Sequence, residues 1–400
     1  MGNSGVMSST LLSVIAALLL APVAVLAVEI VAAIWGRRSV FSSAANPPSV
    51  AILIPAHNEE AGIPATLRSI LPQLQVHDRL IVVADNCSDR TAAVAEAEGA
   101  EVVSRTDPHK RGKGFALDFG IQHLRSNPRS ILIIVDADCE VAPRAISCLA
   151  TLCANYQRPI QAQYLMRNQA DARLKQRIAE FAWVVKNLVR PLGLANLGLP
   201  CQLMGSGMAF PWAVINSVDL ANSHLVEDMK MGLDLARRGV APIFCPDALV
   251  QSYFPTDDQG RKDQRTRWEH GHLGIIAREA PRALCQGLKT MDIALLALAL
   301  DLCVPPLALL VMVVTLFVGV ASILYLTSGY RAPLVIASCA FIALGVTVIA
   351  AWASHGRRIV SFSNLLSASF YPLLKIPMYV RFVFSRQREW IRSKRDNDRD

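Results

Sequence analysis

The sequence predicts an α/β domain with a mostly parallel sheet, flanked by transmembrane helices. Apolar residues make up 52% of the 400-residue chain, and their excess collects at residues 8–35 and 293–352. Each of these segments exceeds the roughly 20 apolar residues that cross a bilayer. Between them, residues 49–289 alternate short β-rich apolar runs with helix-like segments. Such alternation is typical of βαβ units, in which parallel strands are joined by helices.

Residues 8–35 predict the first transmembrane helix, with Glu29 as the only charge. Residues 25–27 resemble a signal-peptide cleavage site, and cleavage there would place the central domain outside the cell. However, the first ten residues carry no basic side chain, and an arginine pair follows the apolar run at residues 37–38. An uncleaved anchor is therefore the favoured interpretation.

Four short apolar runs in the central domain predict strands, at residues 50–54, 80–84, 101–104 and 131–135. The first, second and fourth runs are each followed by polar or acidic residues. Ligands bind outside the carboxyl ends of the strands in open α/β sheets. We therefore expect a binding site at this edge of the sheet.

Further apolar segments follow the central domain. Residues 293–326 predict a transmembrane region that is interrupted at the doubled proline 305–306, because proline removes a backbone donor. The first part of the region either lies at the membrane interface or kinks at the prolines before it spans. Residues 332–353 predict a third transmembrane helix. Residues 359–384 are interrupted by polar and basic side chains and favour an interfacial helix. Residues 385–400 predict a charged, disordered tail.

The basic residues cluster at the edges of the apolar segments. A net charge of +8 raises the question of nucleic-acid binding, but the chain has no recognisable nucleic-acid module. The positive-inside rule places residues 1–7 outside and both the central domain and the tail in the cytoplasm. The nine scattered cysteines suit a reducing cytosol. The sequence thus predicts a multi-pass protein of the plasma (inner) membrane that contacts membrane lipids and does not bind nucleic acid.

Asp136 and Asp138 directly follow the fourth predicted strand. Alternate side chains of an extended segment point the same way, so both carboxylates can approach one site. Carboxylates are hard ligands that suit Mg²⁺ or Mn²⁺ bridging a diphosphate. The same pattern is also typical of a turn. From this motif alone, the metal site and the turn are equal alternatives.

Five ordered motifs resemble those of the family 2 glycosyltransferases. They are residues 55–60 (Pro-Ala-His-Asn-Glu-Glu), 85–89 (Asp-Asn-Cys-Ser-Asp), 136–138 (Asp-Ala-Asp), 227–228 (Glu-Asp) and 264–268 (Gln-Arg-Thr-Arg-Trp). The last motif resembles the membrane polysaccharide synthases for cellulose, hyaluronan, chitin oligosaccharides and poly-N-acetylglucosamine. The resemblance covers about residues 50–284. It implies a GT-A-type, Rossmann-like domain that binds a nucleotide sugar.

The resemblance also implies which residues bind the donor and the metal. The donor-binding residues would be Pro55, Asn58, Glu59, Asp85, Lys113, Asp136, Gln264 and Arg267. Asp136 and Asp138 would hold Mg²⁺ or Mn²⁺, with Asp138 as the firmest ligand. Residues 58–60 also suit a helix cap with an acidic first turn, and the two interpretations are compatible.

Glu227 and Asp228 open a predicted helix at residues 228–238, which ends at Gly239. They would lie at the positive end of the helix dipole, which predicts that Asp228 is ionised at neutral pH. An ionised carboxylate can deprotonate an acceptor hydroxyl as it attacks the anomeric carbon, which inverts the configuration. We predict Asp228 and Glu227 as the catalytic residues. The alternative is a helix cap with no catalytic role.

A helix predicted to begin near Asp263 would place Gln264, Arg267 and Trp268 on one face. Arg267 can bind the departing diphosphate through its planar guanidinium, and Trp268 can stack against an acceptor sugar. Residues 254–262 resemble the gating loop of the family. Alternatively, Arg267 and Trp268 form a pair at the membrane interface.

Residues 205–211 (Gly-Ser-Gly-Met-Ala-Phe-Pro) resemble the acceptor-side strand of the family. Gly205 and Ser206 therefore join Trp268 as the predicted acceptor-binding residues. Many relatives continue this strand with basic residues, whereas this chain continues with Pro-Trp. Any contact made by those basic residues is in doubt here.

These features predict a metal-dependent hexosyl- or N-acetylhexosaminyl-transferase that uses a UDP-sugar. The leading hypothesis is an inverting enzyme that extends a β-linked surface polysaccharide or oligosaccharide. Three spans make a narrow conduit for such a chain, so a homo-oligomer or an export partner would have to complete it. One alternative is the addition of a single sugar to a lipid-linked acceptor. The other is a non-catalytic, nucleotide-binding relative.

Overall fold

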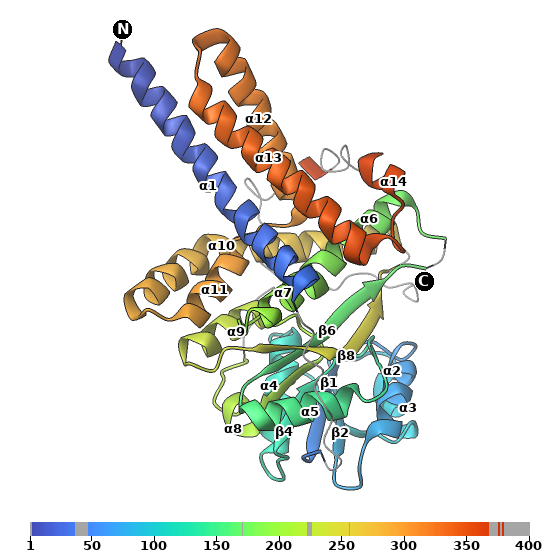
Figure 1. Cartoon of the computed structure of the whole chain (residues 1–400). Helices are drawn as coiled ribbons and strands as arrows, with labels where there is room; N and C mark the ends of the chain where they lie inside the picture. Colours follow the sequence, from blue (N-terminus) through green and yellow to red (C-terminus); the bar gives the residue numbers. More distant parts are fainter. Residues whose placement is uncertain are drawn as a thin grey trace.

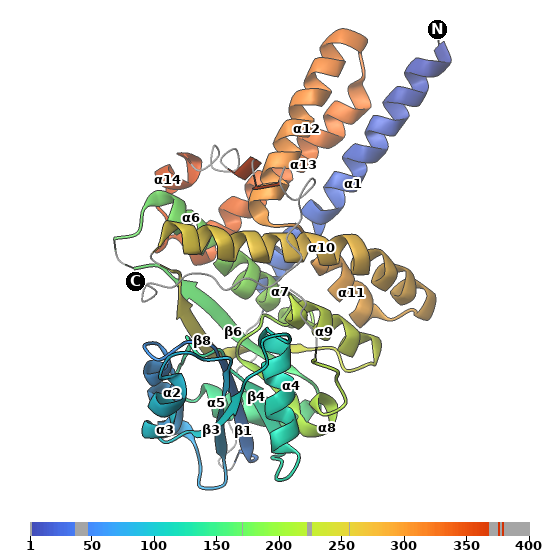
Figure 2. The same ribbon diagram turned by 180° about the vertical axis from the view of Figure 1, so that it is seen from behind.

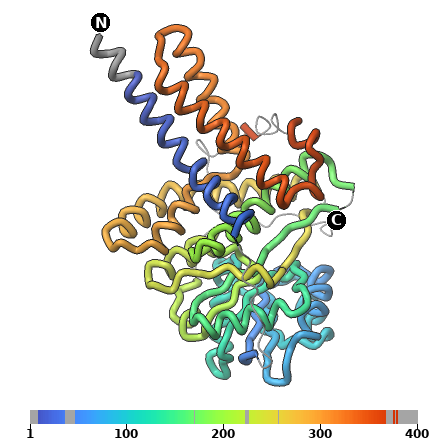
Figure 3. Tube along the Cα trace, viewed as in Figure 1, coloured from blue at the N-terminus to red at the C-terminus, as the bar shows by residue number. Residues whose placement is uncertain are grey.

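The computed structural model describes residues 2–36, 47–169, 171–221, 226–255, 257–367, 375–376 and 378–379. A domain built on a β-sheet occupies one end of the molecule, and long helices rise from the other end (Figure 1). The trace in Figure 3 shows the N-terminal helix beside the helices formed by residues 307–328 and 331–351, so segments far apart in the sequence pack together.

The described residues contain an eight-stranded sheet in the order β3-β2-β1-β4-β7-β6-β8-β5. Its strands are β1 Val50–Ala56, β2 Arg79–Asp85, β3 Glu101–Arg105, β4 Ile131–Ile134, β5 Glu140–Val141, β6 Ile160–Arg167, β7 Met208–Pro211 and β8 Ile243–Tyr253. Strands β1 to β4 pair in parallel, but β7 is antiparallel to both of its neighbours and β5 is antiparallel to β8. The sheet is therefore mixed rather than mostly parallel. The prediction of a mostly parallel sheet failed for the strands from β5 onwards, because no βαβ unit joins β6 to its antiparallel neighbour β7.

Helices cover both faces of the parallel half of the sheet. These helices are α2 Ile63–Ile70, α4 Lys113–Leu124, α5 Ala145–Tyr156, α8 Trp212–Ile215 and α9 Glu227–Arg237. Ile52 and Ile54 of β1 pack towards α2 and α5, whereas Ala51 and Leu53 pack towards α4. Strands buried on both faces have continuous apolar sequences rather than alternating ones. This explains why the first strands were visible in the sequence.

The described residues include three helices that are long and apolar enough to cross a membrane. They belong to α1 Gly2–Trp35, α12 Leu307–Ser328 and α13 Arg331–Ala351, which continues as the π-helix η3 Trp352–Gly356. All three lie side by side in both views (Figures 1 and 2). Helix α1 also includes residues 2–7, so it begins earlier than predicted. The membrane topology remains a prediction.

The predicted region 293–326 is two separate helices rather than one kinked span. Helix α11 Ile293–Leu302 ends before the doubled proline, and α12 begins at Leu307 after it. Leu295, Leu298 and Leu302 of α11 are buried against α9 and α10. Helix α10 Asp258–Thr290 runs between the sheet domain and the long helices (Figure 2). A short helix, α14 Phe362–Ser367, lies in the predicted interfacial segment. Half of that segment, residues 37–38 and the tail lie outside the described residues.

A buried ionic cluster fastens α1 to the rest of the molecule. Arg190, which begins α7 Arg190–Asn196, donates from Nε to Glu29 Oε2 at 2.7 Å and from a terminal nitrogen to Asp301 Oδ1 at 2.5 Å. All three residues are at most 6% exposed. A Cβ on Gly193 would lie 1.8 Å from the carbonyl oxygen of Glu29, so only glycine permits this close approach. Two charges within the apolar segments thus meet at one arginine.

Candidate functional site

A cavity of about 720 Å³ opens at the carboxyl ends of β1, β2 and β4. Twelve of the fourteen predicted site residues line it: Pro55, Glu59, Asp85, Lys113, Asp136, Asp138, Gly205, Glu227, Asp228, Gln264, Arg267 and Trp268. Asn58 and Ser206 are not among the lining residues. The expected edge of the sheet therefore gathers residues that lie far apart in the sequence, while their individual roles remain predictions.

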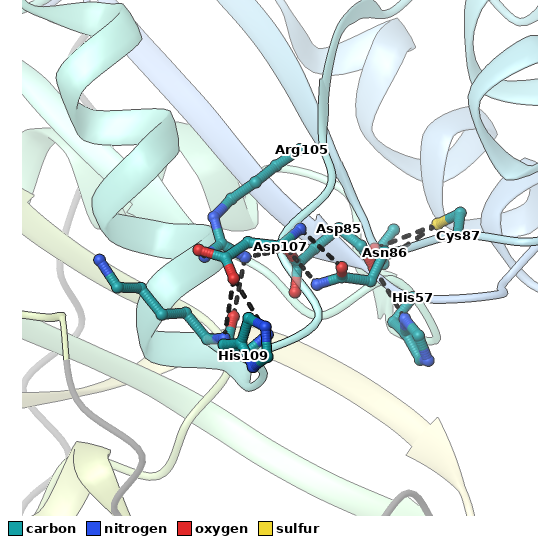
Figure 4. Close-up of polar contacts among 9 residues, drawn as sticks. His57, Asp85, Asn86, Cys87, Arg105, Asp107 and His109 are labelled. Carbon is teal, nitrogen blue, oxygen red and sulfur yellow. Dashed lines mark hydrogen bonds and ion pairs between the residues drawn. The ribbon is translucent and has the colours of Figure 1, made fainter.

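Asp85 occupies the end of β2 and is held by several partners (Figure 4). A terminal nitrogen of Arg105 donates to Asp85 Oδ1 at 2.5 Å, and the Asn86 amide donates to the same oxygen at 3.0 Å. The ring nitrogen Nδ1 of His57 lies 2.7 Å from the Asp85 carbonyl oxygen. Arg105 was not identified from the sequence, although its position at the end of the adjacent strand would have been a signal.

Asn58 joins two loops instead of lining the cavity. The backbone N–H of Ser88 donates to Asn58 Oδ1 at 2.7 Å, and Asn58 Nδ2 donates to Ser88 Oγ at 3.1 Å. Its backbone has a φ of 54°, which asparagine tolerates better than most residues. Asn58 thus has a structural role, and its donor contact stays a prediction. Residues 58–60 do not cap a helix either, because α2 begins at Ile63 after Gly62.

Asp136 and Asp138 bring carboxylate oxygens close to each other. Together with the Cys139 sulfur, their ligand atoms lie within 4.8 Å of one another. Burial raises the pKa of the Cys139 thiol well above its usual range, and Asp138 adds to this rise, so the thiol stays protonated. The cluster therefore offers two hard oxygen donors and no thiolate. This donor set fits Mg²⁺ or Mn²⁺ better than a soft metal.

Lys113 lies between the Asp136 carboxylate and the acceptor-side strand. It forms an ion pair with Asp136 and donates from Nζ to the Gly205 carbonyl oxygen at 2.7 Å. Burial lowers the pKa of Lys113, but Asp136 and Glu227 raise it more, so the amine remains charged. Gly205 has a φ of 93°, and a Cβ there would lie 3.2 Å from Asp228 Oδ2. Glycine lets this backbone approach the predicted base.

Ser206 lies behind the cavity wall. Its side chain is 0% exposed, and its Oγ accepts from the backbone N–H of Asp136 at 3.0 Å. The predicted contact between Ser206 and the acceptor stays a prediction. In the structure, the hydroxyl fixes the segment that carries Asp136.

Glu227 and Asp228 begin α9, as predicted, and the pKa of each is raised. Burial raises the pKa of Glu227 to about 7, and Asp228 adds to the rise. Burial also raises the pKa of Asp228, although the Met229 N–H and Lys113 oppose this rise. The helix dipole alone does not keep both groups ionised. Two such carboxyl groups titrate as a pair.

The raised pKa of this pair predicts a pH dependence. A base must be deprotonated to accept a proton, so kcat/KM for transfer should rise from about pH 6 to about pH 8. Glu227→Gln should shift the rise to lower pH, because it removes the carboxyl group whose pKa is about 7. The measurement is a pH–rate profile of each protein. An equal rate across this range in the unaltered protein would contradict the prediction.

Three aromatic side chains that line the cavity pack against one another. The rings of Trp268 and Trp183 have centroids 4.8 Å apart, and Phe254 lies 6.1 Å from Trp183. Trp183 belongs to α6 Leu174–Val184, and Lys186 belongs to the following π-helix, η2 Val185–Val189. Both line the cavity, and neither was identified from the sequence. Only tertiary packing brings them to the site.

The helix that carries Gln264, Arg267 and Trp268 begins earlier than predicted. Asp257 caps α10 by accepting from the Gly260 N–H at 2.6 Å, and the helix starts at Asp258. Most of the predicted gating loop, 254–262, is therefore helical. The prediction failed because Asp257 caps this helix and Asp258 lies in its first turn.

Residues 47–271 match the family described as "Glycosyltransferase like family 2". The 4,4'-diaponeurosporenoate glycosyltransferase of Staphylococcus haemolyticus (strain JCSC1435) is 30% identical over 197 residues, covering 46% of this chain and 50% of that protein. The probable glycosyltransferase YdaM of Bacillus subtilis (strain 168) is 25% identical over 246 residues, covering 58% of this chain and 57% of that protein. The chain thus spans about half the length of the curated relatives it matches.

A mannosyltransferase from Pyrobaculum calidifontis, solved in complex with GDP-Man and Mn²⁺, has a similar structure. Its TM-score is 0.52 at 16% sequence identity, covering 84% of this chain and 99% of that chain. At this identity the likeness shows the fold, which is of the GT-A type.

Proposed function

Because the chain belongs to the glycosyltransferase-like family 2, we propose that it transfers a single sugar from a nucleotide diphosphate to a lipid-linked acceptor. One observation carries the choice of acceptor. A second cavity, of about 850 Å³, shares Trp183, Lys186 and Trp268 with the first and extends between α12 and α13. The proposal places the domain on the cytoplasmic side of the inner membrane.

The donor half of the reaction rests on the ends of β1, β2 and β4. The nucleotide would lie by Glu59 and Asp85, and Asp136 and Asp138 would hold Mg²⁺ or Mn²⁺ against the diphosphate. A bound ion would supply positive charge to the departing diphosphate. Arg267, which also lines this cavity, would contribute charge-assisted hydrogen bonds to the diphosphate.

The acceptor half rests on the carboxylate pair at the start of α9. Asp228 takes the proton from an acceptor hydroxyl, with Glu227 as its coupled neighbour. The hydroxyl oxygen forms a bond to the anomeric carbon while the bond from that carbon to the diphosphate oxygen breaks. Displacement from the opposite side inverts the anomeric configuration. The aromatic wall of Trp183 and Trp268 offers flat faces for a sugar ring.

The second cavity suits an apolar chain. Val311 and Leu316 of α12 line one side, and Leu344 and Val348 of α13 line another. Because a lipid tail is apolar and a sugar is not, this lining favours a lipid-linked acceptor over a bare saccharide. Homo-oligomers or export partners are not needed for this product.

A growing β-linked polysaccharide is the second candidate, and one observation favours it. Gln264, Arg267 and Trp268, which carry the resemblance to polysaccharide synthases, line the catalytic cavity together. Product length distinguishes the two candidates.

Product analysis tests the proposal. Purified protein in detergent is incubated with radiolabelled UDP- and GDP-sugars, Mn²⁺ and a membrane-lipid extract. We expect one radiolabelled product that partitions into organic solvent and is lost when EDTA removes the metal. A ladder of water-soluble products would establish the polysaccharide candidate instead. Donor binding without any transferred sugar would support the non-catalytic alternative.

A further inference from the structure

We infer that the acceptor carries a phosphate group between its lipid chain and its reacting hydroxyl, and that Lys186 binds this phosphate. The inference rests on the proposed function and narrows its acceptor class. It assigns a specificity role to Lys186, a residue outside the recognised motifs.

Lys186 lies where the two cavities meet. It lines the catalytic cavity together with Asp228 and lines the apolar cavity together with the residues of α12 and α13. Lys186 belongs to the π-helix η2. π-Helical turns occur frequently at functional sites. Because Lys186 lines both cavities, an acceptor that places its tail in one cavity and its hydroxyl at Asp228 would pass close to it.

Three of the other cations that line the apolar cavity have a carboxylate partner in the structure. Arg190 pairs with Glu29 and Asp301, Arg261 pairs with Asp258, and Lys375 pairs with Glu269. Among the described residues, Lys186 has no carboxylate within ion-pair distance. Its Nζ lies 5.9 Å from the centroid of the Trp183 ring.

A largely buried ammonium group without a counterion is costly, and a ligand anion would offset that cost. Burial lowers the pKa of Lys186, which agrees with a charge that lacks a close partner. A phosphate at this point would complete an ion pair inside a partly apolar channel, where charge-assisted hydrogen bonds are strong. The apolar cavity would hold the lipid chain, Lys186 would contact the phosphate, and Asp228 would face the reacting hydroxyl.

The test compares two synthetic probes. In one, a farnesyl chain is joined to N-acetylglucosamine through a diphosphate; in the other, the same chain is joined directly to the sugar. Binding is followed by the tryptophan fluorescence of the full chain in detergent, and UDP affinity is measured in parallel. The unaltered protein should bind the diphosphate probe about 10-fold or more tightly than the neutral probe.

Three variants make the test specific. Lys186→Met should remove the preference for the diphosphate probe, whereas Lys186→Arg should retain most of it. Lys289→Met, which alters an exposed lysine at the end of α10, is the matched control and should behave like the unaltered protein. All three variants should keep their affinity for UDP. An unchanged affinity would show that the variant is folded and that its donor site is intact.

Three results would overturn the inference. A preference that survives in Lys186→Met, with UDP affinity unchanged, would separate Lys186 from the acceptor. Loss of UDP affinity in Lys186→Met but not in Lys186→Arg, together with strong competition by inorganic diphosphate, would assign Lys186 to the donor. If the unaltered protein transfers sugar to the neutral probe equally well, the proposed function stands and this inference fails. The binding measurement needs no turnover, so failed transfer alone does not decide it.

Discussion

Asp228→Asn should lower kcat for sugar transfer by about 10²–10⁴-fold, the usual contribution of a positioned general base. Asparagine keeps the shape and the oxygen that accepts from the Met229 N–H at 2.8 Å, but it cannot take a proton from the acceptor. The affinity for UDP should stay within about twofold, because the predicted nucleotide contacts lie on β1 and β2. Initial rates with radiolabelled donor and calorimetry with UDP measure the two quantities.

Asp234→Asn is the matched control for this variant. Asp234 lies on the same helix, where its carboxylate pairs with Lys230 and Arg237 away from the cavity lining. We expect nearly unchanged kcat. If Asp228→Asn retains normal turnover, another group must accept the proton, and Asp228 loses its proposed role.

The fold was predictable where local pattern and tertiary structure agree. The parallel strands β1 and β2 are buried on both faces, so their sequences are continuously apolar. The antiparallel strand β7 was not visible as such, because its direction depends on the long connection through α6, η2 and α7 rather than on its own four residues. Strand direction in the second half is thus a property of the whole chain.

The candidate site was predictable where function leaves a short motif at a strand or helix end. Asp85, Asp136 and Asp228 fall in this class. Trp183 and Lys186 do not, since they lie inside an amphipathic helical segment whose composition is ordinary. Their relation to the site exists only because this segment packs between the sheet domain and α10.

The pKa of Asp228 shows a further limit of what the sequence predicts. Its position at a helix N-terminus correctly indicated a favourable dipole. Burial and the nearby Asp136 act in the opposite direction and raise the pKa of Asp228. Burial depends on the walls of the cavity, which the local sequence does not contain.

Arg190→Met should cost about 3–5 kcal/mol of stability, the typical effect of removing one partner from a buried ion pair. Methionine fills a similar volume, but it leaves Glu29 and Asp301 as two buried carboxylates without their shared cation. Thermal unfolding in detergent measures the loss. Arg237→Met is the matched control, because Arg237 pairs with Asp234 and Glu279 in a more exposed place; a much smaller loss is expected there.

The triple variant Glu29→Gln, Arg190→Met, Asp301→Asn separates charge from packing. If uncompensated charge causes the loss, removing both carboxylates should recover most of the stability. A triple variant as unstable as Arg190→Met would instead assign the loss to packing. The distinction bears on the acceptor site, because Arg190 directly follows the π-helix that carries Lys186. By fixing α1 and α11 to α7, the ionic cluster would also hold Lys186 at the junction of the two cavities.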